Sequence, residues 1–142
     1  MMSIVVMPCL NEVHYIDKAI TSLLDAAADA PPDAQLVAVD NGSSDGTLDL
    51  LTCIAKSFAG RVHIVEERRR GFVPPRDTGV LTAAAIAARL GLPPKDVLIL
   101  QADADTIYQS RYIAIMERAA EGTAGYIFEG AAKYPQDFAT DH

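Results

Sequence analysis

Asp103 and Asp105 are the residues of this chain whose type and spacing most directly predict chemistry. They follow an apolar run, residues 97–100, that is typical of a strand buried on both faces. Two carboxylates that flank one small residue repel each other unless a cation or strong hydrogen-bond donors lie nearby. Such oxygen ligands suit Mg²⁺ or Mn²⁺, which also bind the phosphates of a ligand. The alternative is a solvated turn in which both aspartates only cap the next helix.

The composition narrows the class of protein. The chain has 142 residues and a net charge of −7, with 12 Lys and Arg against 19 Asp and Glu, which argues against general nucleic-acid binding. No apolar run approaches the roughly 20 residues of a membrane span, and residues 3–7 are too short for a signal-peptide core. Cys9 and Cys53 lack paired ligand spacing and are interpreted as reduced. We expect a cytoplasmic protein with one domain over residues 1–130 and an irregular tail over 131–142.

Segments typical of strands and helices alternate along the chain. Apolar runs predict strands at residues 3–7, 35–39, 62–65 and 97–100, with a fifth candidate at 125–128. The first strand is expected to end at Pro8, and the third helix to begin at about Asp77. Inward-facing stripes of the first and third helices are Ile16, Ile20, Leu23, Ala27 and Val80, Ala83, Ala87, Leu90. This alternation predicts an α/β fold, a mostly parallel doubly wound sheet with flanking helices. For such a sheet we expect the strand order 3-2-1-4.

Polar segments follow the carboxyl ends of these strands, where open α/β sheets bind ligands. In the expected strand order, residues 8–12 form the floor of a crevice between Asp40-Asn41 and residues 103–105. An amide or carboxylate at Asp40-Asn41 could bind the edge of a base, although turn formation also explains both residues. We interpret residues 68–70 as a solvated basic turn. Arg76 is expected to face a phosphate because it lies at the start of a helix.

Four segments together resemble the family 2 glycosyltransferases, nucleotide-sugar-dependent enzymes of the GT-A fold. The matching segments are residues 6–12, 39–47, 71–79 and 103–105, in the family's order and at its approximate spacing. Each segment is a weak signal, and the set is specific. The resemblance covers nearly the whole chain and includes the Rossmann-like, nucleotide-binding half of the fold.

The resemblance implies the donor-binding part of a metal-dependent glycosyltransferase that transfers a sugar, with inversion, to an unknown acceptor. It implies a UDP- or GDP-linked donor and a Mn²⁺ or Mg²⁺ ion at Asp103 and Asp105. The residues that it implies for nucleotide-sugar binding are Pro8, Cys9, Leu10, Asn11, Glu12, Asp40, Asn41, Arg76, Asp103, Ala104 and Asp105. Many family members have Asp where this chain has Asn41, and an aromatic residue where it has Leu10.

The catalytic base stays unassigned, because no carboxylate after Asp105 has the family's context. Two alternatives remain open: a non-catalytic nucleotide-binding module that retains only the donor-binding half, and a nucleotidyltransferase. The second normally has a Gly-rich loop with Lys or Arg after the first strand, and residues 8–12 contain none of these. An uncovered sheet edge favours association, so we expect a homo-oligomer or a partner chain.

Overall fold

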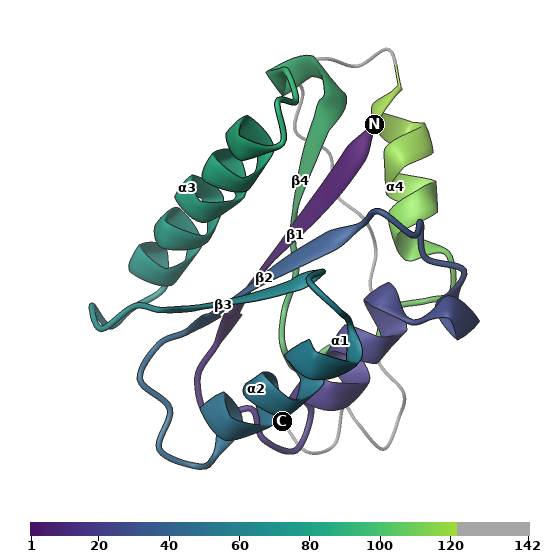
Figure 1. Cartoon of the computed structure of the whole chain (residues 1–142). Coiled ribbons are helices and arrows are strands. Elements are labelled where there is room, and N and C mark those ends of the chain that lie inside the picture. The colour runs from purple at the N-terminus through teal and green to yellow at the C-terminus, as the bar shows by residue number, and fades with distance from the viewer. Residues whose placement is uncertain (122–142) are drawn as a thin grey trace.

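The computed structural model of the protein describes residues 1–121 (Figure 1). Its strands are Met2–Cys9 (β1), Gln35–Asp40 (β2), Val62–Glu66 (β3) and Val97–Gln101 (β4). Its α-helices are Ile16–Leu24 (α1), Thr47–Ser57 (α2), Val73–Arg89 (α3) and Tyr112–Ala120 (α4), with short 3₁₀ turns at Ala26–Ala28 (η1) and Pro94–Asp96 (η2). The candidate strand at 125–128 and the tail at 131–142 lie outside the described residues.

The four strands form one parallel sheet in the order β3-β2-β1-β4. This confirms the predicted α/β class and strand order. β1 lies between β2 and β4, and Val6 of β1 is opposite both Val37 and Gln101. All four carboxyl ends therefore meet at one edge of the sheet, with the end of β1 in the middle.

Helices cover both faces of the sheet. Figure 1 shows α3 on one side and α1, α2 and α4 on the other. Successive side chains of a strand point to opposite faces, so Val5 and Met7 pack in the core beneath α1, α2 and α4, while Ile4 and Val6 pack beneath α3. Within residues 1–121, none of the helices has the length and apolar character needed to cross a bilayer.

Prolines account for two differences from the sequence-based expectations. Helix α3 begins at Val73 rather than at about Asp77, because Pro75 and its neighbouring proline lie in the first turn, where backbone N–H groups have no intrahelical partner. β1 continues through Pro8 to Cys9. The backbone groups of Pro8, like those of Val6, are directed toward β4. The β1–β4 register ends at Val6, so the missing N–H of Pro8 removes no hydrogen bond between the strands.

Three burial predictions are wrong. Leu90 is 49% exposed, because it is the C-cap residue of α3, beyond the part of the helix that packs on the sheet. Ala27 is exposed, because α1 ends at Leu24 and Ala27 lies in the following 3₁₀ turn. Residues 97–99 of β4 are only partly buried, because in the described part of the chain β4 is an edge strand next to β1.

Gly79 sets how closely α3 approaches the sheet. A Cβ atom at this position would clash with Cγ1 of Val6 and would lie 3.2 Å from Cγ2 of Val39. A larger residue therefore cannot occupy this position without moving the helix or the strands.

Candidate functional site

A cavity of about 520 Å³, here called the strand-end cavity, opens at the carboxyl edge of the sheet. Four segments line it: the end of β1, the end of β2, the start of α3 and the loop after β4. Its lining residues are Pro8, Cys9, Leu10, Glu12, Asn41, Gly71, Phe72, Pro75, Arg76, Asp103, Ala104 and Asp105. The structure thus brings together all the predicted site residues except Asn11 and Asp40, which do not line the cavity.

Cys9 contributes a neutral thiol to the floor of the cavity. Its side chain is buried and donates to the main-chain oxygen of Met7 at 3.3 Å. Burial, followed by the negative charges of Asp40 and Glu12, raises the pKa of the Cys9 thiol far above its ordinary value. Because only the thiolate is a strong nucleophile, Cys9 contributes surface and shape to this site.

Asn11 connects two of the loops at the site. Its backbone is left-handed, with φ of 54°, and its N–H donates to Oγ of Ser43 at 2.9 Å. Its side-chain Oδ1 accepts the N–H of Ser44 at 2.8 Å. These bonds join the β1–α1 loop to the β2–α2 loop. The predicted contact of Asn11 with a nucleotide-sugar stays a prediction.

Asp40 holds a buried carboxylate at the end of β2, opposite Cys9 in the β1–β2 register. The residue is 3% exposed, and its Oδ2 accepts the N–H of Ser43 at 3.2 Å. Its Oδ1 is buried and has no hydrogen-bond partner within residues 1–121. Because a buried acceptor without a partner is costly, this oxygen is suited to a donor that a ligand would bring.

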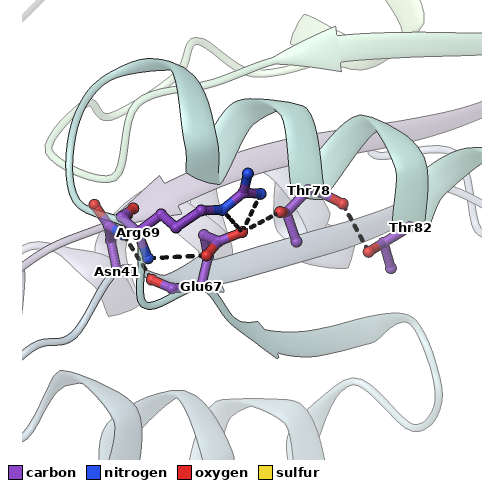
Figure 2. Close-up of polar contacts among 5 residues, drawn as sticks. All are labelled: Asn41, Glu67, Arg69, Thr78 and Thr82. Carbon is purple, nitrogen blue, oxygen red and sulfur yellow. Dashed lines mark hydrogen bonds and ion pairs between the residues drawn. The ribbon is translucent and has the colours of Figure 1, made fainter.

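Asn41 lines the cavity but is itself only 3% exposed. Its side-chain Nδ2 donates to the main-chain oxygens of Glu67 at 2.6 Å and Arg69 at 2.9 Å (Figure 2). The amide donor is therefore already used by the loop that follows β3.

The loop after β4 presents two carboxylates to the cavity. Ala102 and Ala104 are buried, while the Asp103 side chain is 57% exposed. The backbone N–H of Asp103 donates to the hydroxyl of Tyr108 at 2.8 Å, which fixes the turn. No cluster of three or more Asp, Glu, His or Cys side chains suited to a metal occurs in the described part of the chain. Two carboxylates at Asp103 and Asp105 fit an ion that completes its coordination with water and phosphates, as Mg²⁺ commonly does.

Arg76 lies between an aromatic ring and a carboxylate. Its guanidinium carbon is 3.6 Å from the centre of the Phe72 ring, and its Nη1 donates to the Phe72 main-chain oxygen at 3.0 Å. Its Nη2 is 3.7 Å from Oδ1 of Asp103. Gly71, Phe72 and Pro75 also line the cavity and were missing from the predicted site. The available signal was a large aromatic residue in a Gly- and Pro-flanked loop, four residues before an arginine.

Solved structures share this fold at low sequence identity. Residues 1–349 of S. aureus TarS in complex with UDP match with a TM-score of 0.65 and 19% identity, over 85% of this chain and 32% of that chain. The same TarS fragment in complex with UDP-GlcNAc gives a TM-score of 0.61 at 19% identity, over 84% and 31%. Another TarS crystal structure gives 0.57 at 21% identity, over 84% and 19%. The chain thus spans about a third or less of the length of these structures.

Comparison of sequences gives the family. No curated protein sequence matches the chain. The family model described as Glycosyl transferase family 2 matches residues 4–130, which is most of the sequence and includes every predicted site residue. With the parallel sheet and the cavity at its carboxyl edge, this match shows that the chain belongs to glycosyl transferase family 2.

Proposed function

We propose that the chain binds a nucleotide-diphosphate sugar in the strand-end cavity and forms the donor site of a metal-dependent, inverting glycosyltransferase. The observation that carries this proposal is the convergence of Asp103, Asp105 and Arg76 on one cavity at the end of β1. Its volume of about 520 Å³ is ordinary for a small-molecule site. The TarS structures with UDP and UDP-GlcNAc support a uridine nucleotide over other donors.

The base is assigned to the side of the cavity formed by β1 and β2. The unpartnered Oδ1 of Asp40 would accept an N–H group from the edge of the base. Pro8 and Leu10 line the same side and offer apolar contact to a flat ring. A nucleobase with an N–H group at its pairing edge, such as uracil or guanine, satisfies this requirement.

The diphosphate is assigned to the opposite side, between Arg76 and the loop after β4. Asp103 and Asp105 would hold a Mn²⁺ or Mg²⁺ ion, which when bound neutralises the charge that develops on the departing diphosphate. Arg76 would bind the same diphosphate through its guanidinium group. Its contact with Asp103 is 3.7 Å long and partly solvated, so exchanging that contact for phosphate oxygens costs little.

Inversion requires an acceptor hydroxyl to attack the anomeric carbon opposite the diphosphate, usually with a general base. Glu117 does not supply this base here, since its carboxylate accepts the hydroxyl of Ser3 at 2.7 Å, at the amino end of β1. Glu121 is the C-cap residue of α4, and Glu129, Asp137 and Asp141 lie outside the described residues. The base is therefore left unassigned.

Calorimetric titration tests the proposal. UDP-, GDP- and TDP-sugars are titrated into the wild-type chain and into Asp105→Ala, each with and without Mn²⁺. We expect one nucleotide to bind, with an affinity that Mn²⁺ raises about tenfold, about 1.4 kcal/mol, in the wild type and not in the variant. Failure of every nucleotide to bind would refute the proposal. Binding without donor hydrolysis or transfer would favour the non-catalytic module.

A further inference from the structure

The end of β2 holds the loop that follows β3, residues 67–72, through its main chain. The side chain of Asn41 donates to the main-chain oxygens of Glu67 and Arg69, at 2.6 and 2.9 Å. The N–H of Glu67 in turn donates to the main-chain oxygen of Asp40 at 2.9 Å. Three hydrogen bonds therefore join two neighbouring residues of one strand end to a loop more than 25 positions later in the chain.

The Glu67 side chain extends this attachment to helix α3. Its carboxylate accepts the N–H of Arg69 at 2.9 Å, the Arg69 guanidinium at 2.8 Å and the hydroxyl of Thr78 at 2.6 Å (Figure 2). The side chain is only 12% exposed, and these bonds, led by that from the Arg69 side chain, lower the pKa of Glu67 to about 2. Glu67 is thus ionised at neutral pH and fixed between the loop and the helix.

The attached segment carries one wall of the strand-end cavity. Gly71 and Phe72 lie in the loop, and Arg76 lies in α3 two residues before Thr78. The bonds made by Asn41 and Glu67 therefore attach the loop and the start of α3 to the end of β2. If these bonds loosen, the ring of Phe72 and the guanidinium group of Arg76 lose their fixed positions.

The chemistry of the bonds explains why an amide stands at position 41. Both partners of the Asn41 side chain are carbonyl oxygens, which accept and cannot donate. A carboxylate at this position would place negative charge against two acceptors and would leave both without a donor. Asn41 is therefore not interchangeable with aspartate in this chain, although the two side chains have nearly the same shape.

We propose that Asn41 and Glu67 are positioning residues, which clamp loop 67–72 and the start of α3 so that Phe72 and Arg76 are held in place before a ligand arrives. The clamp acts through hydrogen bonds and contributes no contact to the reacting atoms. Its consequence for ligand binding rests on the function proposed above, whereas its effect on the loop does not.

Asn41→Asp tests the clamp, with Asn11→Asp as the matched control. Both variants exchange an amide for a carboxylate beside the same cavity. Asn11 uses its side-chain oxygen as an acceptor, which Asp retains, whereas Asn41 uses its nitrogen as a donor, which Asp lacks. By hydrogen–deuterium exchange we expect the Glu67 and Arg69 amides to exchange about tenfold faster in Asn41→Asp and to be unchanged in Asn11→Asp.

The pH dependence separates a lost donor from general damage. The carboxyl group introduced at position 41 gains an O–H donor when it is protonated, so the ratio of exchange rates, variant to wild type, should fall toward one as the pH drops to about 4. The charged groups around this position are Asp40, Glu67, Arg69 and Arg70. All four are also present in the wild type, so the ratio removes their own effects. A ratio that is constant with pH would contradict the donor role.

Glu67→Gln, with Glu66→Gln as its control, provides a second test that is independent of position 41. Glu66 is the neighbouring residue and is exposed, so its neutralisation changes the net charge equally. We expect the Arg69 amide to exchange about fivefold faster in Glu67→Gln, because a charged acceptor becomes a neutral one, and not in Glu66→Gln. If Asn41→Asp does not fold, this pair decides the proposal.

Nucleotide binding completes the test and separates the two proposals. If UDP binds the wild type, its affinity should fall about tenfold in Asn41→Asp through loss of a preformed wall. If the wild type binds no nucleotide, the proposed function fails while the exchange measurements still decide the clamp. A folded Asn41→Asp whose loop amides exchange as in the wild type, or as in Asn11→Asp, would overturn the clamp.

Discussion

The ends of β2 and β4 carry the same kinds of residue and use them in opposite ways. At the end of β2, Asp40 and Asn41 are each 3% exposed and bond to main-chain groups of neighbouring loops. At the end of β4, the Asp103 side chain is 57% exposed, and its carboxylate contacts Arg76 at 3.7 Å. The end of β2 is held by buried bonds to neighbouring loops, whereas Asp103 at the end of β4 can exchange Arg76 for another partner. Burial, rather than residue type, separates these roles.

Truncation should give the largest difference between the two ends. Asn41→Ala removes the donor to two main-chain oxygens, and we expect the free energy of unfolding to fall by about 2 kcal/mol. Asp103→Ala should change it by less than about 0.5 kcal/mol, because the side chain is exposed. Urea unfolding of both variants measures the difference. Equal losses of stability would show that the two ends do not differ in this way.

The response to manganese should reverse this order. Asp103→Asn should remove the gain in UDP affinity that Mn²⁺ gives, about tenfold or 1.4 kcal/mol, and leave the affinity without metal nearly unchanged. Asp40→Asn should lower the affinity about fivefold under both conditions, because a charge-assisted bond to the base becomes a neutral one. Calorimetry with and without Mn²⁺ distinguishes the two patterns. A metal-dependent effect of Asp40→Asn would indicate that the ion binds at the end of β2, which would contradict its assignment to the loop after β4.

Acid should lower the stability of the folded chain through protonation of Glu67. The pKa of this carboxyl group falls from 4.5 to about 2 through its bonds to Arg69 and Thr78. The folded state therefore binds fewer protons than the unfolded state between these values, and the stabilisation present above pH 4.5 is lost as the pH falls toward 2. Thermal midpoints measured across this range should vary less with pH in Glu67→Gln than in the wild type. An unchanged slope would contradict the assignment.

The smallest effect is expected at the ring beneath Arg76. Phe72 is 71% exposed, so Phe72→Ala should leave stability nearly unchanged. Loss of the cation–π contact, worth about 0.5–1 kcal/mol at exposed sites, should lower UDP affinity about threefold. Phe72→Tyr keeps an aromatic face and should bind as the wild type does. If both variants bind UDP normally, the ring has no part in holding Arg76.

Much of the framework was predictable from the sequence. The alternation of apolar runs and helical stripes predicts the parallel α/β sheet, whose observed strand order is the one expected for a doubly wound sheet. The turn residues after β1, β2 and β4 include most of the cavity lining. The predicted start of α3, at about Asp77, is four residues too late, because Pro75 and its neighbouring proline lie within the first turn of the helix. Prolines at that point are compatible with a segment before a helix and with its first turn, so the sequence pattern does not separate the two.

The hydrogen-bond partners of the site residues were not predictable from the sequence in the same way. Glu66 and Glu67 are neighbours of the same type. Only the structure shows that Glu66 is exposed, while the Glu67 carboxylate accepts hydrogen bonds from three donor groups. Periodicity identifies the face on which a residue lies. It does not identify which donor meets which acceptor across loops that are far apart in sequence, as Asn41 and Glu67 do.

The bare backbone at Gly79 also has a consequence for the width of the strand-end cavity. Arg76 lies one helical turn before the point where α3 touches Val6 and Val39 of the sheet. Any side chain at position 79 would clash with Val6 and push α3 away from the sheet. The space available to a diphosphate beside Arg76 thus depends on Gly79, a residue that does not itself line the strand-end cavity.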